Sequence, residues 1–480
     1  MPADPPHELS LPPHKPERRP VSLFFLIVAL MLIYNSNFRT VRINDSLPAQ
    51  LLPFSLLLDH TVYLDRWFPH EVSAARSRRM YYVRHIHGHW LSSYPIILPV
   101  LLLPLYVLPA AIVHSQHTSP LEAALLTPLV VETMAKFCAS LIAALSAGVL
   151  YLALRKKAGA NAALIITLIY SLASNTFSTS SQALWRQGFT ELCFAFLLWA
   201  LWREGSAEQR AFWAGLALAA ATANKLADVA ILLPFLVYFA RRSRRELLAS
   251  LAPMSVLGLL VLAYNLHYFH SLLGGYPNPF LPPMRTFPTG VGRTSFSVGL
   301  AGLMASPSRG LLIYAPWTVF ALWGAVRMWK QNAYGWARYL IVGMTAVYVL
   351  QAKFGQWWGG WCFGPRYMTD LLPFFALFLL AVWEGVRRSK ALTAAMVAAL
   401  GASLWVQVVG VYYYPRGQWD SKPVSVQWAT KRLWNWRDTQ LSRTWAAGPS
   451  LPELPDEWIN YFKTRERLNH SQARSQSLRE

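Results

Sequence analysis

The sequence is poor in charge, in acidic residues and in cysteine. Only 14% of its 480 residues are charged, and 23 aspartates and glutamates stand against 44 lysines and arginines. Ordinary soluble domains are excluded, because apolar runs such as 246–268 and 391–413 carry almost no charge and are long enough to cross about 30 Å of hydrocarbon. The three cysteines, an odd number, do not indicate a disulfide framework.

Hydrophobic residues are abundant, at 54% of the chain, and they fall in long runs separated by short basic clusters. This pattern is typical of a helical membrane protein with many spans. The formal net charge of +21 is also found in nucleic-acid-binding proteins. Here the excess lies mostly in loops between apolar runs, where it sets membrane orientation. We therefore expect membrane lipids and no nucleic acid among the partners.

The apolar runs predict an all-α fold with eleven transmembrane helices. They cover residues 21–37, 129–154, 161–179, 185–202, 209–223, 226–241, 246–268, 310–328, 336–352, 368–386 and 391–413. Basic clusters at 155–157, 203–210, 241–245, 327–330 and 387–390 then share the side of the N-terminus. By the positive-inside rule that side is the cytoplasm of a bacterial inner membrane, and the C-terminus is periplasmic. No small-x-small cleavage site follows the first run, so we expect it to be retained.

Residues 92–113 form a further apolar run, which we do not expect to cross the bilayer. Four prolines interrupt it, at positions 95, 99, 104 and 109. Each lacks a backbone N–H and clashes with the preceding turn, so the run is expected to be bent, re-entrant or interfacial. If it does cross, every later loop inverts. The runs 209–223 and 226–241 are short, and a re-entrant pair there is an alternative.

The chain divides into a membrane domain and two flanking tails. Residues 1–20 are expected to form a disordered cytoplasmic tail, and 21–413 the transmembrane domain. That domain contains a large first periplasmic loop, 39–95, and a second, 269–309, which is rich in Gly and Pro and is expected to be irregular. Residues 414–480 form a Trp-rich periplasmic tail that we expect at the membrane interface or outer surface, with its last dozen residues disordered.

Asp45 is the acidic residue that stands out, because it follows the first predicted helix closely. A carboxylate so near the membrane surface is placed to meet the head group of a lipid-linked substrate. The alternative is that Asp45 caps the helix predicted to begin near Leu47. In the same loop His85, His87 and His89 alternate, but no partner motif accompanies them, so we expect no zinc site.

Four cations lie where the positive-inside rule does not expect them, at the outer starts of inward-running helices. They are Arg186, Lys225, Arg309 and Arg366. A helix N-terminus already carries partial positive charge, so a cation there is unfavourable unless an anion joins it. Several such ends facing one cavity would hold a phosphate. The alternative is that each cation reaches lipid head groups or pairs with an acid, as Lys225 with Asp228 or Arg366 with Asp370.

The loop that precedes Arg366 has the features of a binding wall. Trp357 and Trp358 alone would be explained as part of an aromatic belt at the membrane boundary. Gly359 and Gly360 are not explained in that way, because adjacent glycines let the backbone approach a ligand closely. We assign these four residues, with Tyr94 and Tyr367, to the wall of the predicted cavity.

The predicted spans hold almost no ionisable residue at mid-depth. A coupled transporter normally needs such groups near the bilayer centre. Their scarcity, with acids and cations gathered at the outer helix ends, favours chemistry at the membrane surface over passage through it.

Several of these features together resemble the GT-C glycosyltransferases, the superfamily of protein O-mannosyltransferases and the lipid A aminoarabinose transferase. They are an acid just after the first helix, a large first loop, Ser-Tyr-Pro at 93–95, Ser-Pro-Ser-Arg-Gly-Leu-Leu at 306–312 and Trp-Trp-Gly-Gly-Trp-x-x-Gly-Pro-Arg-Tyr at 357–367. The likeness is nearest to an uncharacterised bacterial group and covers roughly residues 20–413.

The resemblance implies transfer of a sugar from a polyprenyl-phosphate donor to a hydroxyl of a glycan, lipid or protein acceptor at the periplasmic face. Asp45 matches the general base. The cations Arg366, Arg309, Lys225 and Arg186 would stabilise the departing lipid phosphate. Many relatives carry Asp-Glu where this chain has Asp45-Ser46, so no cofactor is certain and a divalent metal stays open. The alternative function is a lipid-linked glycan transporter or flippase that makes no bond.

Overall fold

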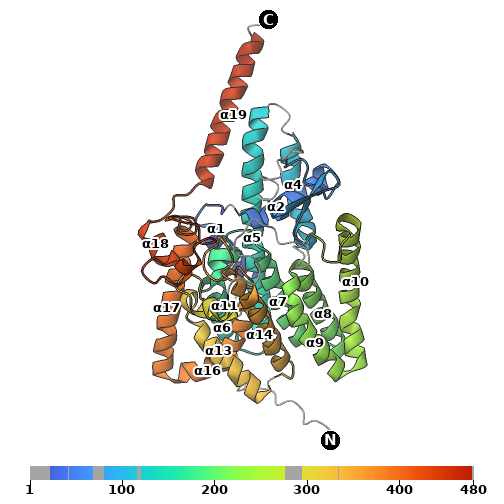
Figure 1. The fold of residues 1–480 in the computed structure, drawn as a ribbon, viewed down its shortest axis with the longest axis vertical. Coiled ribbons are helices and arrows are strands. Elements are labelled where there is room, and N and C mark those ends of the chain that lie inside the picture. Colours follow the sequence, from blue (N-terminus) through green and yellow to red (C-terminus); the bar gives the residue numbers. More distant parts are fainter. Residues whose placement is uncertain are drawn as a thin grey trace.

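The fold is almost entirely helical, as the sequence predicts. The computed structural model describes residues 22–41, 43–68, 80–115, 120–275, 295–332 and 334–477. Within these ranges the only sheet is an antiparallel hairpin of β1 (Val83–Ile86) and β2 (His89–Ser92), in which Val83 pairs with Ser92. The expected all-α fold is therefore confirmed (Figure 1).

Helices occur along the whole of the described chain. The first half contains α1 (Leu23–Asn35), η1 (Asn44–Ser46), α2 (Leu47–Leu58), α4 (Ile97–Ser115), α5 (Pro120–Leu154), α6 (Ala160–Leu172), η2 (Thr176–Ser180), α7 (Arg186–Trp202), α8 (Ala207–Asn224), η3 (Leu226–Asp228), α9 (Val229–Arg242) and α10 (Arg244–Phe269). The second half contains α11 (Phe296–Ala305), α12 (Leu311–Tyr314), α13 (Thr318–Gln331), α14 (Ala337–Lys353), α15 (Arg366–Thr369), α16 (Leu372–Arg388), α17 (Lys390–Tyr412), η4 (Thr430–Trp434), α18 (Gln440–Ala446) and α19 (Leu454–Ser477).

The predicted count of eleven spans is wrong for the described residues. Helices lie at all eleven places, but only four helical segments are long and apolar enough to cross a membrane: α4, Leu126–Leu154 of α5, α10 and α17. A perpendicular span needs about 20 residues, whereas α9 and α13 have 14 each. The predicted run 310–328 is divided between α12 and α13, because Pro316 has no N–H to continue the helix.

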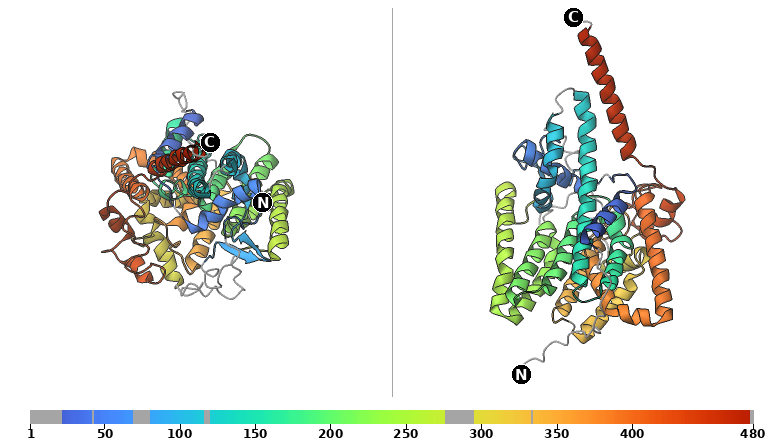
Figure 2. Two further views of the ribbon diagram at one scale, coloured as in Figure 1. Left: turned by 90° about the horizontal axis from the view of Figure 1, so that it is seen from above. Right: turned by 180° about the vertical axis from the view of Figure 1, so that it is seen from behind.

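Three of the four prolines of the run 92–113 lie within one continuous helix, and Pro95 lies before it. Residues Ile97–Ser115 form one helix, α4, with Pro104 and Pro109 inside it. Pro99 falls in the first turn, where a backbone N–H has no partner within the helix in any case. In Figures 1 and 2, α4 stands beside the upper part of α5, above the layer of α7, α8 and α9. That α4 does not cross the bilayer remains a prediction.

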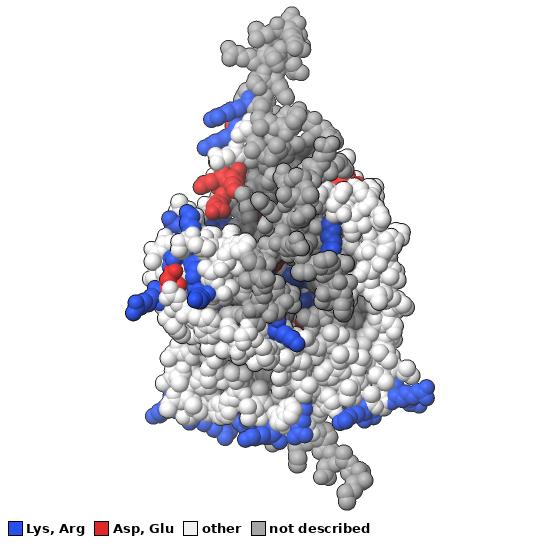
Figure 3. Space-filling model, in the orientation of Figure 1, with Lys and Arg blue, Asp and Glu red and all other residues white. Residues whose placement is uncertain are grey.

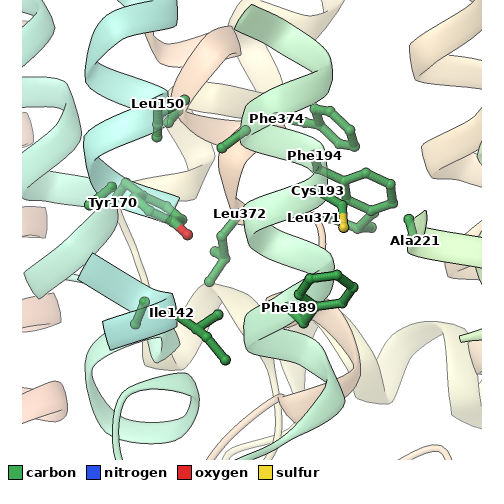
Figure 4. Close-up of a cluster of buried hydrophobic side chains, with 14 of the residues drawn as sticks. Ile142, Leu150, Tyr170, Phe189, Cys193, Phe194, Ala221, Leu371, Leu372 and Phe374 are labelled. Atoms are coloured by element: carbon green, nitrogen blue, oxygen red, sulfur yellow. The ribbon is translucent and has the colours of Figure 1, made fainter. Parts of the chain in front are cut away.

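The core of the bundle forms where α5, α6, α7 and α16 meet. Figure 4 shows Leu150, Tyr170, Phe194 and Phe374 projecting toward one another from these four helices. The rings of Phe194 and Phe374 have centroids 4.7 Å apart. Aromatic side chains bury the largest apolar areas of any residues, so this cluster holds together helices far apart in the sequence.

Charge is segregated along the long axis of the molecule. On the face drawn in Figure 3, Lys and Arg form a band at the lower end, and a broad uncharged belt lies above it. The last turns of α9, α13 and α16 are basic, and all three helices end at the lower end in Figure 1. Within the belt, α10 leaves Val256, Leu259 and Leu260 more than half exposed. Such an apolar surface is compatible with a membrane protein.

The C-terminal tail is a packed structure rather than a loose segment. Trp419 is buried, α18 packs beside α17, and Ser306 donates a hydrogen bond to the carbonyl oxygen of Leu433 in η4. The helix α19 projects away from the bundle (Figures 1 and 2). The prediction that the last dozen residues are disordered is wrong as far as Ser477, because the α19 backbone is helical to that residue. The second loop, 269–309, was predicted to be irregular, but it contains the helix α11. Residues 276–294 of this loop and the N-terminal residues 1–20 lie outside the described residues.

Candidate functional site

Asp45 lies on η1, the short turn between α1 and α2. Its carboxylate contacts Arg366, a residue 321 positions later in the chain. Its Oδ2 accepts a hydrogen bond from Nη1 of Arg366 at 2.6 Å, and its Oδ1 accepts one from the Tyr81 hydroxyl at 2.5 Å. The helix α2 begins without a side-chain cap. Asp45 therefore does not cap α2, and both of its oxygens belong to a cluster that the tertiary structure assembles.

Arg366 is held by aromatic rings on two sides. Its guanidinium carbon lies 4.2 Å from the ring centre of Trp185 and 5.2 Å from that of Tyr367. Stacking of this kind stabilises a buried guanidinium without using its N–H donors. The side chain is 8% exposed, and its Nε has no hydrogen-bond partner. One buried donor beside Asp45 is therefore left for an acceptor.

The electrostatic surroundings keep Asp45 ionised. Burial by itself raises the pKa of this carboxyl. The charge of Arg366, the hydrogen bonds from Tyr81 and Arg366, and the charge of Arg186 outweigh burial and hold the pKa of Asp45 below its usual value. At neutral pH the site therefore contains a carboxylate with two cations near it.

Arg186 is the second of these cations. It begins α7, and its guanidinium carbon lies 4.4 Å from the ring centre of Tyr94, a half-buried residue just before α4. The helices α7 and α16 both run from this site to the basic end, since α7 ends next to Arg203 and α16 ends at Arg387 and Arg388. The site therefore lies at the end of the bundle opposite the basic band.

Lys225 belongs to the same cluster but is already neutralised. Its Nζ forms an ion pair with Asp370, both side chains being buried. From the sequence, Lys225 could form an ion pair with Asp228, and Arg366 with Asp370. In the structure, Lys225 pairs with Asp370, and Arg366 pairs with Asp45. One oxygen each of Asp370 and Asp228 is buried without a hydrogen-bond partner. Lys225 is therefore a weaker candidate for a phosphate than Arg366.

Arg309 does not share this cluster. It is fully buried, and its five N–H donors all make hydrogen bonds. The acceptors are the carbonyl oxygens of Ser308, Trp358 and Gly360, the amide oxygen of Gln440 and Oδ1 of Asp420. A phosphate would have to displace one of them. Arg309 therefore ties the C-terminal tail to the bundle and offers no donor to a lipid phosphate.

The predicted wall residues have two different roles. Trp357 and Trp358 are 1% exposed and pack in the core; the Trp357 ring lies so close to Gly302 that no larger residue fits there. Gly359 and Gly360 have φ of +79° and +72°, which favours glycine. A Cβ on Gly359 would lie 3.4 Å from Nε of Arg366, so this backbone passes directly beside the cation.

The described residues contain no group of three or more His, Cys, Asp and Glu side chains suited to a metal ion. In the first loop, His89 contacts Asp65, its Nδ1 lying 2.6 Å from a carboxylate oxygen, and its ring stacks on Tyr63. The contacts with Asp65 and Tyr63 indicate that His89 stabilises the fold of the first loop.

Two residues of the site, Tyr81 and Trp185, were missed by sequence reasoning, and a third, Asp370, was given the wrong partner. Tyr81 is one of many polar residues in the first loop, and only the fold brings it to Asp45. Trp185 immediately precedes Arg186 in the sequence. This position next to a predicted cation was the signal that could have identified Trp185 as a residue of the site. Asp370 lies four residues after Arg366, and its actual partner, Lys225, was not the one that this spacing suggested.

No family model, curated protein or solved structure matches this chain. The functional argument therefore depends on the geometry of the site, and the resemblance to the GT-C glycosyltransferases remains a prediction.

Proposed function

We propose that this chain is a glycosyltransferase that moves a sugar from a polyprenyl-phosphate donor to an acceptor hydroxyl. The observation that carries the proposal is the ion pair between Asp45 and Arg366, residues 321 positions apart, with Arg186 acting on the same carboxylate. A carboxylate that accepts a proton beside cations that bind phosphate is the pairing that sugar transfer from a lipid phosphate requires. The reaction is proposed at the membrane face opposite the basic band, the periplasmic face of a bacterial inner membrane.

The chemistry balances with the groups present. The acceptor oxygen forms a bond to the anomeric carbon, and its proton passes to the carboxylate of Asp45. The bond from the anomeric carbon to the phosphate oxygen breaks, and the lipid phosphate leaves with the electron pair. Negative charge thus grows on the phosphate, where Nε of Arg366 and the guanidinium of Arg186 offset it.

The test is release of the carrier lipid by the purified full-length chain in nanodiscs. The probes are polyprenyl phosphates carrying radiolabelled hexose or pentose, with a bacterial membrane extract as the source of acceptors. Asp45→Asn removes the proton acceptor and is expected to lower release at least 100-fold, the lower range for general base catalysis. Asp59→Asn is the matched control, because Asp59 lies in the same loop but pairs with the exposed Arg66; its activity should stay within twofold.

Undiminished release by a folded Asp45→Asn variant would overturn the proposal. Labelled lipid that moves between leaflets at the same rate in both proteins, with no carrier released, would instead identify a flippase. Gel filtration establishes whether each variant is folded.

A further inference from the structure

A cavity adjoins the site without including its charged pair. It has a volume of about 470 Å³ and lies between the first loop, α2 and the first half of α5. Its wall includes Asn44, which immediately precedes Asp45, and Ala183, two residues before Trp185; neither Asp45 nor Arg366 lines it. The volume falls in the range of about 300–1,000 Å³ that is usual for small-ligand sites.

Lys136 is the cation in the wall of this cavity. It is 3% exposed, and its Nζ donates to the side-chain oxygen of Gln182. No carboxylate pairs with it in the part of the chain that the structure describes. The carboxylate of Glu132, one turn earlier on α5, accepts a hydrogen bond from Thr40 at 3.0 Å. Lys136 therefore has a neutral partner where a buried ammonium usually has an anion.

A second basic residue influences Lys136. Arg39 acts on Lys136 through space, and the Nε of Arg39 is buried with no hydrogen-bond partner. The carboxylate that faces Arg39 is that of Glu453, 3.7 Å away and half exposed. Burial disfavours the charged form of both basic side chains, and an anionic ligand beside them would favour that form.

Apart from the carboxylate of Glu132 and a few uncharged polar side chains, the rest of the cavity wall is largely apolar. Val41, Leu47, Leu51, Val131 and Ala135 contribute hydrocarbon from the first loop, α2 and α5. Val131 and Ala135 are 5% exposed and, being four residues apart, share one face of α5, beside the face shared by Glu132 and Lys136. A ligand that satisfies both parts of the wall must carry an anionic head and a hydrocarbon chain.

We propose that this cavity binds an anionic amphiphile. Its carboxylate or phosphate monoester accepts hydrogen bonds from Lys136, and its hydrocarbon chain lies against Leu47, Leu51 and Val131. The site is distinct from the one at Arg366, and the inference stands whether or not the chain transfers sugar. Such a ligand would sit beside the segment that carries Asp45.

The test measures equilibrium binding of three tritiated probes to the full-length chain in nanodiscs, with empty nanodiscs as background. Palmitate and farnesyl phosphate carry the anionic head, and farnesol is the matched neutral probe. Lys136→Met should weaken binding of an anionic probe about tenfold or more and leave farnesol unchanged, because a charge-assisted hydrogen bond is lost. Lys136→Arg should keep most of the affinity. Binding of palmitate alone identifies a fatty acid, and binding of farnesyl phosphate alone a lipid phosphate.

A second variant guards against misfolding. Val131→Phe keeps the charge and fills the apolar part, so it should weaken all three probes. The proposal fails if neither anionic probe binds, if Lys136→Met binds both anions as well as the parent chain does, or if Val131→Phe changes nothing. No donor sugar is present, so failure of the sugar-transfer assay would not affect this result.

Discussion

At the scale of single residues, the site depends on one ion pair, between the buried Arg366 and the part-buried Asp45. Arg366 donates one hydrogen bond to Asp45, the Tyr81 hydroxyl donates another to the same carboxylate, and the rings of Trp185 and Tyr367 lie against the guanidinium of Arg366. A pair with this much support is expensive to break, because removing one partner leaves the other charge uncompensated. The same support explains why Asp45 is ionised while partly hidden from water.

The lowered pKa of Asp45 predicts how stability depends on pH. Because the folded-state pKa lies below the unfolded value of about 4, the pair stabilises the fold fully above pH 4, and this contribution is lost as pH falls through the folded pKa. Asp45→Asn should therefore lower the unfolding temperature at pH 7, and the difference from the parent chain should shrink below pH 4. Thermal unfolding at pH 3 to 8 checks this.

The comparison needs a carboxylate of similar position but weaker coupling. Asp59→Asn serves, because its pair with Arg66 is substantially exposed and such pairs contribute about 0–1 kcal/mol. A difference between Asp45→Asn and the parent that persists undiminished to pH 3 would contradict the assignment.

At the scale of elements, the C-terminal tail is fastened to the bundle by a polar network. Arg309, Asp420 and Gln440 exchange hydrogen bonds, and the guanidinium of Arg309 lies 5.3 Å from the ring centre of Trp419. Arg309 also reaches the carbonyl of Gly360, in the loop that leads to Arg366. The tail thus supports the loop that carries the proposed phosphate-binding residue.

Breaking this network should loosen the tail. Arg309→Met leaves Asp420 buried without its cation, which is expected to destabilise the protein by about 3–5 kcal/mol. Limited proteolysis should then cut within residues 414–453 faster than in the parent chain, and the unfolding temperature should fall. Arg387→Gln is the control, because its partner Glu384 and Arg387 itself are both exposed. Equal proteolysis of both variants would mean that the tail does not depend on Arg309.

At the scale of the whole molecule, the charge distribution defines two ends. The basic helix ends lie at one, and the cluster of Asp45, Arg366 and Arg186 lies at the other. If the basic end is cytoplasmic, as the positive-inside rule predicts, the site and the tail face the periplasm.

Cysteine labelling tests this orientation with little background, because all three native cysteines are buried. Glu204→Cys places a thiol in the exposed α7–α8 connection at the basic end, and Leu451→Cys places one on the tail at a position 78% exposed. In intact cells a membrane-impermeant maleimide should label Leu451→Cys, and it should label Glu204→Cys only after permeabilisation. The reverse pattern would invert the topology.

The sequence by itself determined the helical class, the places of the helices and the two decisive charges. Long apolar runs form helices in any apolar environment, since the backbone must satisfy its hydrogen bonds internally, and Asp45 and Arg366 stand out against a chain so poor in charge. The sequence did not determine where each helix begins and ends, because prolines act differently in different places. Pro99 falls in the first turn of α4, and Pro104 and Pro109 lie within that helix, whereas α12 ends just before Pro316.

Only the tertiary structure decided which partner each charge has. The four-residue spacing suggested an ion pair between Arg366 and Asp370. In the structure, long-range packing instead pairs Arg366 with Asp45, Lys225 with Asp370 and Arg309 with Asp420. An ion pair forms between groups that the fold brings within a few ångströms, and that proximity depends on how the whole bundle packs. The packing also places Lys136 in the wall of a cavity, where its hydrogen-bond partner among the described residues is the neutral Gln182.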